Sequence, residues 1–423
     1  MTMDELCALC PNIPMREMLT KEGKGNSPMY SAPSFEWIPA LNESWTEENL
    51  ETLKTMTKAQ VMAATRPYRD SKGHNEVVES LGYSATTDEN TFAWGAVDSL
   101  DTFAQVAAKT YANDVLGENA KARLTEITNN LITDYKALVG STPWLSEESK
   151  AKAIEKLDHI TTNILEPAAG WFDYSGLNLT PTEEGGTLLS NYLKARQYRL
   201  DREAELIGQP AVGCTVWYMV NPTMANAFYE PTSNSINIIP GVMNSMIYSD
   251  DMDDSTLLGS LGWTIAYEIS HGFDFIGAQF DAYGTNTPLF NEAYLDAFLA
   301  KTTAISEYFS TFELQPGVLY DGSKVVAEAA ADLVGMQLVL DLMANLDNPS
   351  YEKFFAKSAK FYAETVPESV FPVLLADTHP LNYMRVNVNA QMYDPFYDVF
   401  GVTEGDGMYL APEKRIVIWG EKA

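Results

Sequence analysis

The sequence predicts a mainly helical α+β protein organised as two domains. The chain has 423 residues, which is longer than one ordinary domain, and 46% of them are hydrophobic, enough to bury a large core. Segments with helical periodicity fill the first half, and a short group of strand-like segments is followed by further helical segments. We expect the domain boundary near residue 207, because Gly208-Gln209-Pro210 interrupts the helical pattern there.

Four stretches before this boundary have the spacing of amphipathic helices. Ser44-Trp45-Thr46-Glu47 resembles a capping box and would open the first of them. The second is interrupted near Gly117. The third begins at Ser146, where two glutamates follow, and keeps its helical spacing through Leu165. The predicted helices span residues 47–64, 102–139, 146–165 and 187–206.

Short strands are predicted after the boundary, and helices then return. The strand-like runs are rich in β-branched and aromatic residues, and a turn at residues 231–234 joins the last two. The predicted strands span residues 214–220, 226–229 and 235–239, and the later helices span residues 257–275, 292–309, 324–346 and 351–364.

The charge balance is strongly acidic, with 58 Asp and Glu residues against 28 Lys and Arg and a formal net charge of −30. Such a surface repels nucleic acid and anionic membranes, so neither is an expected partner, and it favours solubility. A solvated acidic surface is the simpler explanation of this charge, which therefore does not point to a reaction. No apolar run approaches the roughly 18–20 residues that a membrane-spanning helix needs.

The first residues and the cysteines bear on the cellular compartment. The start, MTMDELCALC, lacks the basic and apolar regions of a signal peptide. We therefore expect either a cytoplasmic protein or an extracellular one whose leading segment is missing from this chain. Three cysteines do not make a disulfide framework, and the CxxC of Cys7 and Cys10 has no second pair.

One helical segment has the geometry of a zinc-binding HExxH motif, although its first residue differs. On a helix, Tyr267 and His271 lie one turn apart on the same face, and Glu268 lies beside them, offset enough to contact a metal-bound water. The sequence therefore reads ExxH, with tyrosine where the first histidine would stand. An ExxH pair alone is weak evidence, because such pairs arise by chance on many amphipathic helices.

Carboxylates occur in an unusually apolar setting further along the chain. Glu328 and Asp332 lie one turn apart in VVAEAAADLVGM. Two buried carboxylates would cost several kcal/mol unless a cation, a metal or hydrogen-bond donors accompany them. The alternative is that both lie on a solvent-exposed stripe, which the apolar neighbours on each side make less favourable.

A third group of polar residues follows near the C-terminus. Asp377 precedes His379 by two residues, and Arg385 follows six residues later. A carboxylate so close in sequence can orient or charge the imidazole, and an imidazolium in a cleft stabilises an oxyanion. By itself, this DxH pattern is weak evidence.

Together, these motifs resemble one family, the neprilysin and endothelin-converting-enzyme zinc metallopeptidases, which include bacterial oligopeptidase O. The match runs in order from about Phe35 to the C-terminus. Asn226-Ala227-Phe228-Tyr229 resembles the family's substrate-binding edge strand, and Asp394-Pro395-Phe396, Phe400-Gly401 and Trp419 resemble its ending. Four motifs in the same order over this length make the resemblance specific.

The resemblance implies a two-domain gluzincin metallopeptidase in which a thermolysin-like catalytic half and a helical half enclose a cavity. The implied parts are a poorly defined segment 1–34, a helical domain 35–206 and a catalytic domain 207–423. One Zn²⁺ and a small peptide substrate are implied as well. The resemblance implies that His271 and Glu328 bind the zinc, with Tyr267 in place of the first ligand histidine, and that Glu268 is the general base. The other implied roles are orientation of a ligand histidine by Asp332; stabilisation of the transition state by Asp377, His379 and Arg385; and binding of the peptide backbone by Asn226 and Ala227.

Three departures from the family pattern leave two functions open. Tyr267 replaces a zinc ligand, Ala329 stands where the family usually has asparagine, and members of the family are longer at the N-terminus. A phenol has a pKa near 10 and must ionise before it binds a metal well. The chain is therefore expected to be either a zinc metalloendopeptidase weakened by Tyr267 or a non-catalytic relative that binds peptides or a protein partner. We expect the three candidate ligands to converge, with His379 and Arg385 across the cleft from Glu328.

Overall fold

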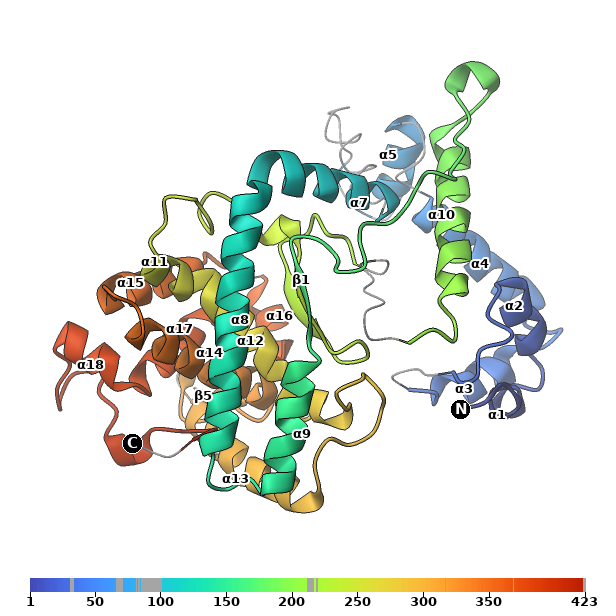
Figure 1. Ribbon diagram of the computed structural model, residues 1–423. Helices are drawn as coiled ribbons and strands as arrows, with labels where there is room; N and C mark the ends of the chain where they lie inside the picture. The colour runs from blue at the N-terminus through green and yellow to red at the C-terminus, as the bar shows by residue number, and fades with distance from the viewer. Residues whose placement is uncertain are drawn as a thin grey trace. The chain divides into compact units, whose positions relative to one another are not determined.

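The computed structural model is mainly helical, as predicted, and divides into two compact units (Figure 1). The first unit comprises residues 1–108, 171–210 and 216–223, and the second comprises residues 109–170, 211–215 and 224–423. The structure describes residues 1–30, 34–65, 71–80, 82, 84, 101–210, 217, 220–315, 317–367 and 369–420. Of the predicted strand 214–220, only residues 217 and 220 are among them, so this prediction lies outside the described residues.

The described helices of the first unit range from 7 to 18 residues in length. The segment 1–34 was left undefined by the sequence. Its residues 1–30 contain two short helices, and Leu6, Cys10 and Ile13 form a small core with Ile38. The predicted capping box at residues 44–47 is wrong, because the helix begins at Leu50 and the Asn49 side chain caps nothing. The helices are α1 (Met3–Leu9), α2 (Met15–Lys21), α3 (Trp37–Ser44), α4 (Leu50–Ala64), α5 (Ser71–Ser80), α7 (Asp101–Thr110, which runs into the second unit) and α10 (Leu188–Glu205).

The second unit contains the long helices. Side-chain caps fix several of their starts, for example Ser146 before α9 and Asn291 before α13. Its main elements are α8 (Gly117–Ser141), α9 (Glu147–Asp158), α11 (Asp254–Leu257), α12 (Trp263–Ser270), α13 (Glu292–Phe309), α14 (Val326–Ala344), α15 (Tyr351–Phe361), α16 (Phe371–Ala376), α17 (Asn382–Gln391) and α18 (Asp394–Phe400). None of the described helices is long and apolar enough to cross a membrane.

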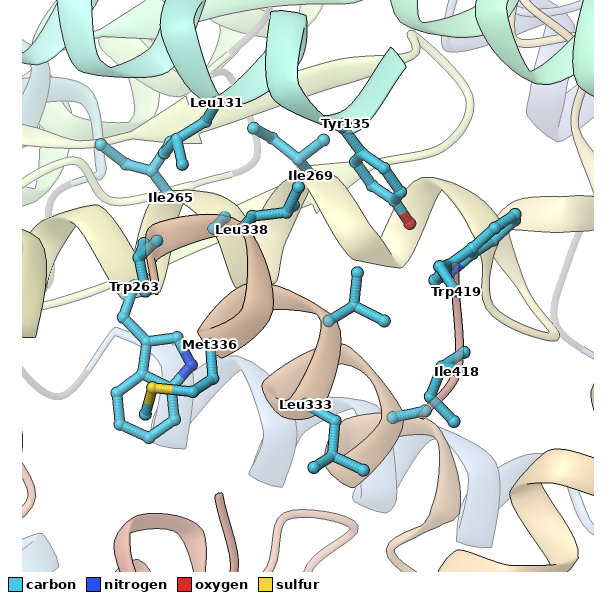
Figure 2. Close-up of a cluster of buried hydrophobic side chains, with 14 of the residues drawn as sticks. Leu131, Tyr135, Trp263, Ile265, Ile269, Leu333, Met336, Leu338, Ile418 and Trp419 are labelled. Atoms are coloured by element: carbon cyan, nitrogen blue, oxygen red, sulfur yellow. The ribbon is translucent and has the colours of Figure 1, made fainter. Parts of the chain in front are cut away.

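The core of this unit lies where α8, α12 and α14 pack together. Figure 2 shows Leu131 and Tyr135 of α8 directed towards Ile265 and Ile269 of α12, and all four side chains are fully buried. Apolar residues of α14 pack against both helices and complete the cluster. Burial of four large side chains at one contact fixes the position of α12, which carries Tyr267.

This packing explains why the structure divides the chain differently from the predicted boundary near residue 207. The sequence placed residues 109–170 with the helical domain, whereas the structure groups them with the second unit. The apolar stripe of α8 is buried against α12 and α14, and its partners are more than 100 residues away in sequence. Periodicity shows that a helix has an apolar face but does not show which element covers it.

A glycine allows α14 to approach α12 closely. A Cβ atom added at Gly335 would lie 2.8 Å from the Tyr267 backbone nitrogen and 3.0 Å from its Cα. At the same crossing, the Trp263 indole Nε1 donates a hydrogen bond to the Asp332 carbonyl oxygen at 3.1 Å. The two helices that carry the candidate ligands are therefore held in backbone contact.

A small sheet lies beside α12 in the order β1 (Thr161–Ile164), β3 (Ser235–Ile238), β2 (Ala227–Glu230). β1 is parallel to β3, and β2 is antiparallel to it, so β2 is an edge strand. The predicted helix 146–165 is wrong beyond Asp158, because its last residues form β1. Thr161, Thr162 and Ile164 are β-branched, and their pairing with β3 overrides the helical spacing. A second hairpin joins β4 (Glu313–Gln315) and β5 (Val318–Leu319).

The close contact at Gly335 predicts the effect of adding one methyl group. We expect Gly335→Ala to destabilise the protein by about 1–3 kcal/mol, because the new Cβ meets backbone atoms that cannot rotate away. Gly140→Ala is the control, since Gly140 is also helical, in α8, and has nothing within 4 Å of a new Cβ. It should leave stability unchanged or raise it. Urea-induced unfolding of both variants measures the difference in the free energy of unfolding. Equal stabilities would show that α12 and α14 can move apart at this contact without a loss of stability.

Candidate active site

The structure places Tyr267, Glu268 and His271 at the end of α12 as the helical spacing predicts. Tyr267 and Glu268 are buried at 6% and 5% exposure, and His271 begins the short turn that follows the helix. The Tyr267 and His271 rings contact each other edge to face, with centroids 4.5 Å apart. Both side chains therefore project to the same side of the helix.

Glu328, in the first turn of α14, meets both of these residues. Its Oε2 accepts a hydrogen bond from the Tyr267 hydroxyl and lies 3.2 Å from His271 Nε2. Burial raises the pKa of Glu328, but the hydrogen bond and charge of His271 outweigh this effect and hold the pKa at about 2. The three expected ligand positions therefore converge on one carboxylate oxygen, which stays ionised.

Asp274 orients His271, a role that the sequence analysis missed. Its Oδ2 lies 2.7 Å from His271 Nδ1, while its Oδ1 accepts hydrogen bonds from the backbone nitrogens of Ile276 and Gly277 at 2.8 Å. Burial lowers the pKa of His271, but Asp274 and Glu328 raise it well above its usual value. The signal in the sequence was an acidic residue three positions after the histidine, at the end of HGFD.

Glu268 faces the edge strand. Its Oε2 accepts a hydrogen bond from the Tyr229 backbone nitrogen at 2.9 Å. Complete burial raises the pKa of Glu268 to about 7, and the neighbouring Glu328 adds to this shift while His271 opposes it. A carboxyl group with a pKa near neutrality can both accept and return a proton at physiological pH.

His379 lies beside Glu328 and not across the cleft from it, so that detail of the expectation is wrong. Its Nε2 is 3.4 Å from Glu328 Oε2, and its Nδ1 is 2.8 Å from Asp377 Oδ1, as the DxH spacing suggested. The side chain is 45% exposed, in the loop between α16 and α17. It can therefore contact both solvent and a ligand in the cleft.

Asp332 and Arg385 pair with each other. Arg385 Nε and Nη2 donate to the two carboxylate oxygens of Asp332 at 2.8 and 2.7 Å, and both residues are buried. The guanidinium also lies 4.9 Å from the centroid of the Tyr267 ring and 4.7 Å from that of Tyr362. The sequence suggested that Asp332 orients a ligand histidine and that Arg385 anchors the substrate. In the structure, each satisfies the charge of the other.

A cleft of about 350 Å³ opens in front of these residues. Its walls come from β2 and the residues before it, from the end of α12 and from the start of α14, and His379 completes the rim. Asn226 is exposed at the entrance to β2, where its Oδ1 accepts a hydrogen bond from the Ala227 backbone nitrogen at 3.0 Å. The outer edge of β2 therefore faces the cleft, where its Ala227 and Tyr229 N–H groups donate to Asn226 and Glu268.

The side chains in the cleft fit a catalytic zinc ion only in part. Two ligands of a tetrahedral zinc lie about 3.4 Å apart, close to the His271–Glu328 separation of 3.2 Å. Burial and the nearby Glu268 raise the pKa of the Tyr267 phenol well above its usual value, so Tyr267 acts as a hydrogen-bond donor. Among the described residues, no group of three or more His, Cys, Asp and Glu side chains could hold a metal ion. The donor set therefore does not fit a three-ligand zinc site.

Comparisons with known proteins give the family. Two sequence profiles, both described as peptidase family M13, match residues 226–416 and residues 1–167. The chain belongs to peptidase family M13. The resemblance to neprilysin and to bacterial oligopeptidase O is thereby confirmed, and so is the fold class.

Individual M13 relatives agree with this assignment. The chain is 33% identical to the neutral endopeptidase of Lactococcus lactis subsp. lactis over 318 residues, which cover 75% of this chain and 50% of the relative. It is 23% identical to Neprilysin-3 of Drosophila melanogaster over 415 residues, covering 90% of this chain and 50% of the relative. The chain thus spans about half the length of the curated relatives it matches.

Solved M13 structures show the same fold. PepO from Lactobacillus rhamnosis is similar with a TM-score of 0.76 at 27% identity, over 91% of this chain and 61% of that chain. The zinc metalloprotease Zmp1 from Mycobacterium tuberculosis, solved with an inhibitor, is similar with a TM-score of 0.80 at 23% identity, over 99% of this chain and 66% of that chain. The mainly helical architecture is therefore that of M13 metallopeptidases.

The buried pair of Asp332 and Arg385 predicts a large cost for removing one charge. We expect Asp332→Asn to destabilise the protein by about 3 kcal/mol, because the Arg385 guanidinium would remain charged in a buried site. Glu148→Gln is the control, since it breaks the exposed ion pair with Lys152 and should change stability by less than about 1 kcal/mol. Urea-induced unfolding compares the two, and a similar small loss in both would contradict the structural role of the buried pair.

Proposed function

We propose that this chain binds small peptides in the M13 cleft and hydrolyses them poorly, because Tyr267 stands in the place of a zinc ligand. The observation that carries the proposal is the hydrogen bond from the Tyr267 hydroxyl to Glu328. That bond uses the carboxylate oxygen that is also next to His271 and His379. The chain thus belongs to a family of metalloendopeptidases while its own metal site is weakened.

Ligand chemistry supports weak zinc binding. A neutral imidazole offers its lone pair at pH 7, whereas a phenol must first lose a proton held with a pKa near 10. That difference is about three pK units, or on the order of 4 kcal/mol. Burial and the surrounding carboxylates raise the pKa of Tyr267 further. Zinc would supply an activated water in a complete site, and two ligands hold it weakly.

Peptide binding depends on other residues. β2 is an edge strand, and an extended peptide can pair with such an edge through backbone hydrogen bonds. Asn226 adds an amide that can donate and accept beside the strand. The Tyr267 side chain takes part in none of the hydrogen bonds between β2 and β3. The edge strand therefore stays in place even if position 267 does not supply a metal ligand.

A second candidate function is a non-catalytic member of the family that binds peptides or a protein partner with the same cleft. Its supporting observation is the lack of a three-ligand group among the described His, Cys, Asp and Glu residues. The two candidates differ only in whether the chain cleaves peptides, which a cleavage assay measures directly.

Restoring the histidine should restore the metal. We expect Tyr267→His to raise bound zinc towards one ion per chain and to raise cleavage of a fluorogenic peptide by at least tenfold, because the site then has three ligands. Tyr267→Phe is the matched control, since it removes the hydroxyl that donates to Glu328 without adding a ligand. Zinc analysis of dialysed protein and initial cleavage rates provide the measurements.

Three outcomes decide between the candidates. Full zinc occupancy and rapid cleavage by the unchanged chain would contradict the proposal. A gain of zinc in Tyr267→His without any cleavage would favour the non-catalytic function. No gain of zinc at all would contradict the assignment of His271 and Glu328 as the remaining ligands.

The edge strand yields a prediction that does not depend on zinc. We expect Asn226→Ala to weaken binding of a labelled extended peptide about fivefold, because one hydrogen bond to the peptide contributes about 1 kcal/mol. Asn130→Ala is the control, since Asn130 is exposed on α8 and does not line the cleft. Fluorescence anisotropy gives both dissociation constants. Equal affinity in the two variants would exclude Asn226 from the peptide-binding surface.

A further inference from the structure

Lys156, on α9, is a buried lysine behind the cleft. It is 1% exposed, and its Nζ donates hydrogen bonds to the carbonyl oxygens of Gly277 and Phe280 at 2.7 and 2.8 Å. Among the described residues, no carboxylate lies within ion-pair distance of this Nζ. Buried lysines usually have a charged partner, so this contact with two main-chain carbonyls is unusual.

Two aromatic rings complete the surroundings of the Lys156 ammonium group. Its Nζ lies 5.7 Å from the ring centroid of Tyr229, on β2, and 5.9 Å from that of Phe273, just after α12. Both distances allow a cation–π interaction, which is strongest away from water. One ammonium group therefore contacts the edge strand and the segment that follows the candidate metal helix.

Asn234 joins the same elements from the other side. Its Nδ2 donates to the carbonyl oxygens of Lys156 at 3.0 Å and Ala282 at 2.9 Å, and its Oδ1 accepts from the Tyr229 hydroxyl at 2.9 Å. The residue is fully buried with a φ of 44°, a left-handed conformation that asparagine tolerates better than most residues. Lys156 and Asn234 together fasten the segment 277–282 to α9 and β2.

The groups of the candidate site lie one hydrogen bond beyond these contacts. Gly277, whose carbonyl Lys156 binds, donates its N–H to Asp274, and Asp274 orients His271. Tyr229, whose ring Lys156 faces, donates its backbone N–H to Glu268. Lys156 is thus connected both to the imidazole of the site and to the peptide-binding edge.

We propose that Lys156 is a positioning residue of the M13 site, whose ammonium charge holds the segment 273–282 and β2 in the arrangement that orients His271 and presents the strand edge to a peptide. The role of Lys156 in peptide binding rests on the proposed function. Its role in ordering the segment 273–282 and β2 does not depend on that function.

The charge of Lys156 can change near neutral pH. Burial lowers the pKa of its amine to about 7, against the opposing charges of Asp274 and Asp281 on the segment after α12. From β2, the titratable neighbour is the Tyr229 phenol, whose pKa burial raises, and the turn at Asn234 contributes a neutral amide. The positioning charge is therefore present below about pH 7 and is lost above it.

As the pH rises above about 7, the contribution of Lys156 to the free energy of unfolding should increase, while its ability to order the two segments should decrease. In the unfolded chain, Lys156 keeps its proton to about pH 10.4, so between about pH 7 and 10.4 the unfolded state binds more protons than the folded state. The contribution of this group to the free energy of unfolding therefore rises with pH in that window. If Lys156 only stabilised the fold, the order of the two segments would not decrease over the pH range in which its contribution to stability increases.

Hydrogen exchange of the backbone amides tests the positioning role without any ligand. We expect Lys156→Met to increase exchange in residues 227–230 and 274–282 by at least tenfold at pH 6.5, and Lys156→Arg, which keeps the charge, to preserve protection at pH 6.5 and 8.5. The unchanged chain should match Lys156→Arg at pH 6.5 and exchange several-fold faster than it at pH 8.5. Comparing variants at one pH removes the intrinsic pH dependence of exchange.

A second buried lysine provides the matched control. Lys357, on α15, is 9% exposed and also donates to a main-chain carbonyl, that of Met246, but does not line the cleft. Lys357→Met should lower thermal stability while leaving exchange in the two segments unchanged. If it loosens them as much as Lys156→Met does, or if Lys156→Met leaves them protected, the positioning role is overturned.

Peptide affinity is the second readout. By fluorescence anisotropy with a labelled extended peptide, we expect Lys156→Met to weaken binding about tenfold at pH 6.5, and Lys156→Arg to bind equally well at pH 6.5 and 8.5. Loosened segments with unchanged affinity would overturn the link to peptide binding. If the unchanged chain binds no peptide, the proposed function fails, and the exchange experiment still decides whether Lys156 positions the two segments. Should Lys156→Met not fold, the pH comparison between Lys156→Arg and the unchanged chain suffices.

Discussion

The close contact between α12 and α14 is the constraint on which the site depends. Gly335 leaves no room for a side chain between the two backbones, and the Trp263 indole bonds to a carbonyl of α14 at the same crossing. With the helices so close, Tyr267 and Glu328 meet directly, and Asp332 lies within reach of Arg385 behind them. The identity of one residue at position 267 therefore affects a carboxylate on the other helix.

The buried charges around position 267 are balanced by hydrogen-bond donors. Glu328 has the Tyr267 hydroxyl, and two imidazole nitrogens lie within 3.4 Å of its Oε2. Asp332 receives both of its hydrogen bonds from Arg385. A carboxylate in an apolar setting needs such partners whether or not a metal is bound. With tyrosine at position 267, the charges of the site are satisfied by protein groups alone, which supports the weak zinc binding that we propose.

The sequence predicts features that depend on local spacing better than features that depend on tertiary packing. The helix 292–309 begins and ends where predicted, and its start is fixed by Asn291, which caps it through a local hydrogen bond. The approach of Tyr267 to His271 follows from one helical turn. β1 was missed because only its pairing with β3 distinguishes it from a continued helix. The pairing of Asp332 with Arg385 was missed for a similar reason, since 53 residues separate them. The burial of Lys156 gives no signal in a helix rich in charged residues.

The contacts that hold β2 are physically separate from the side chains that we propose as metal ligands. The edge strand β2 is held by its pairing with β3, by the Tyr229–Glu268 hydrogen bond and by the contacts of Lys156 and Asn234. None of these interactions involves the Tyr267 side chain. The strand is fastened to α9 and to the segment after α12, and not to the proposed zinc ligands His271 and Glu328. Under the proposed function, the cleft beside β2 therefore keeps its shape whether or not the zinc site is complete.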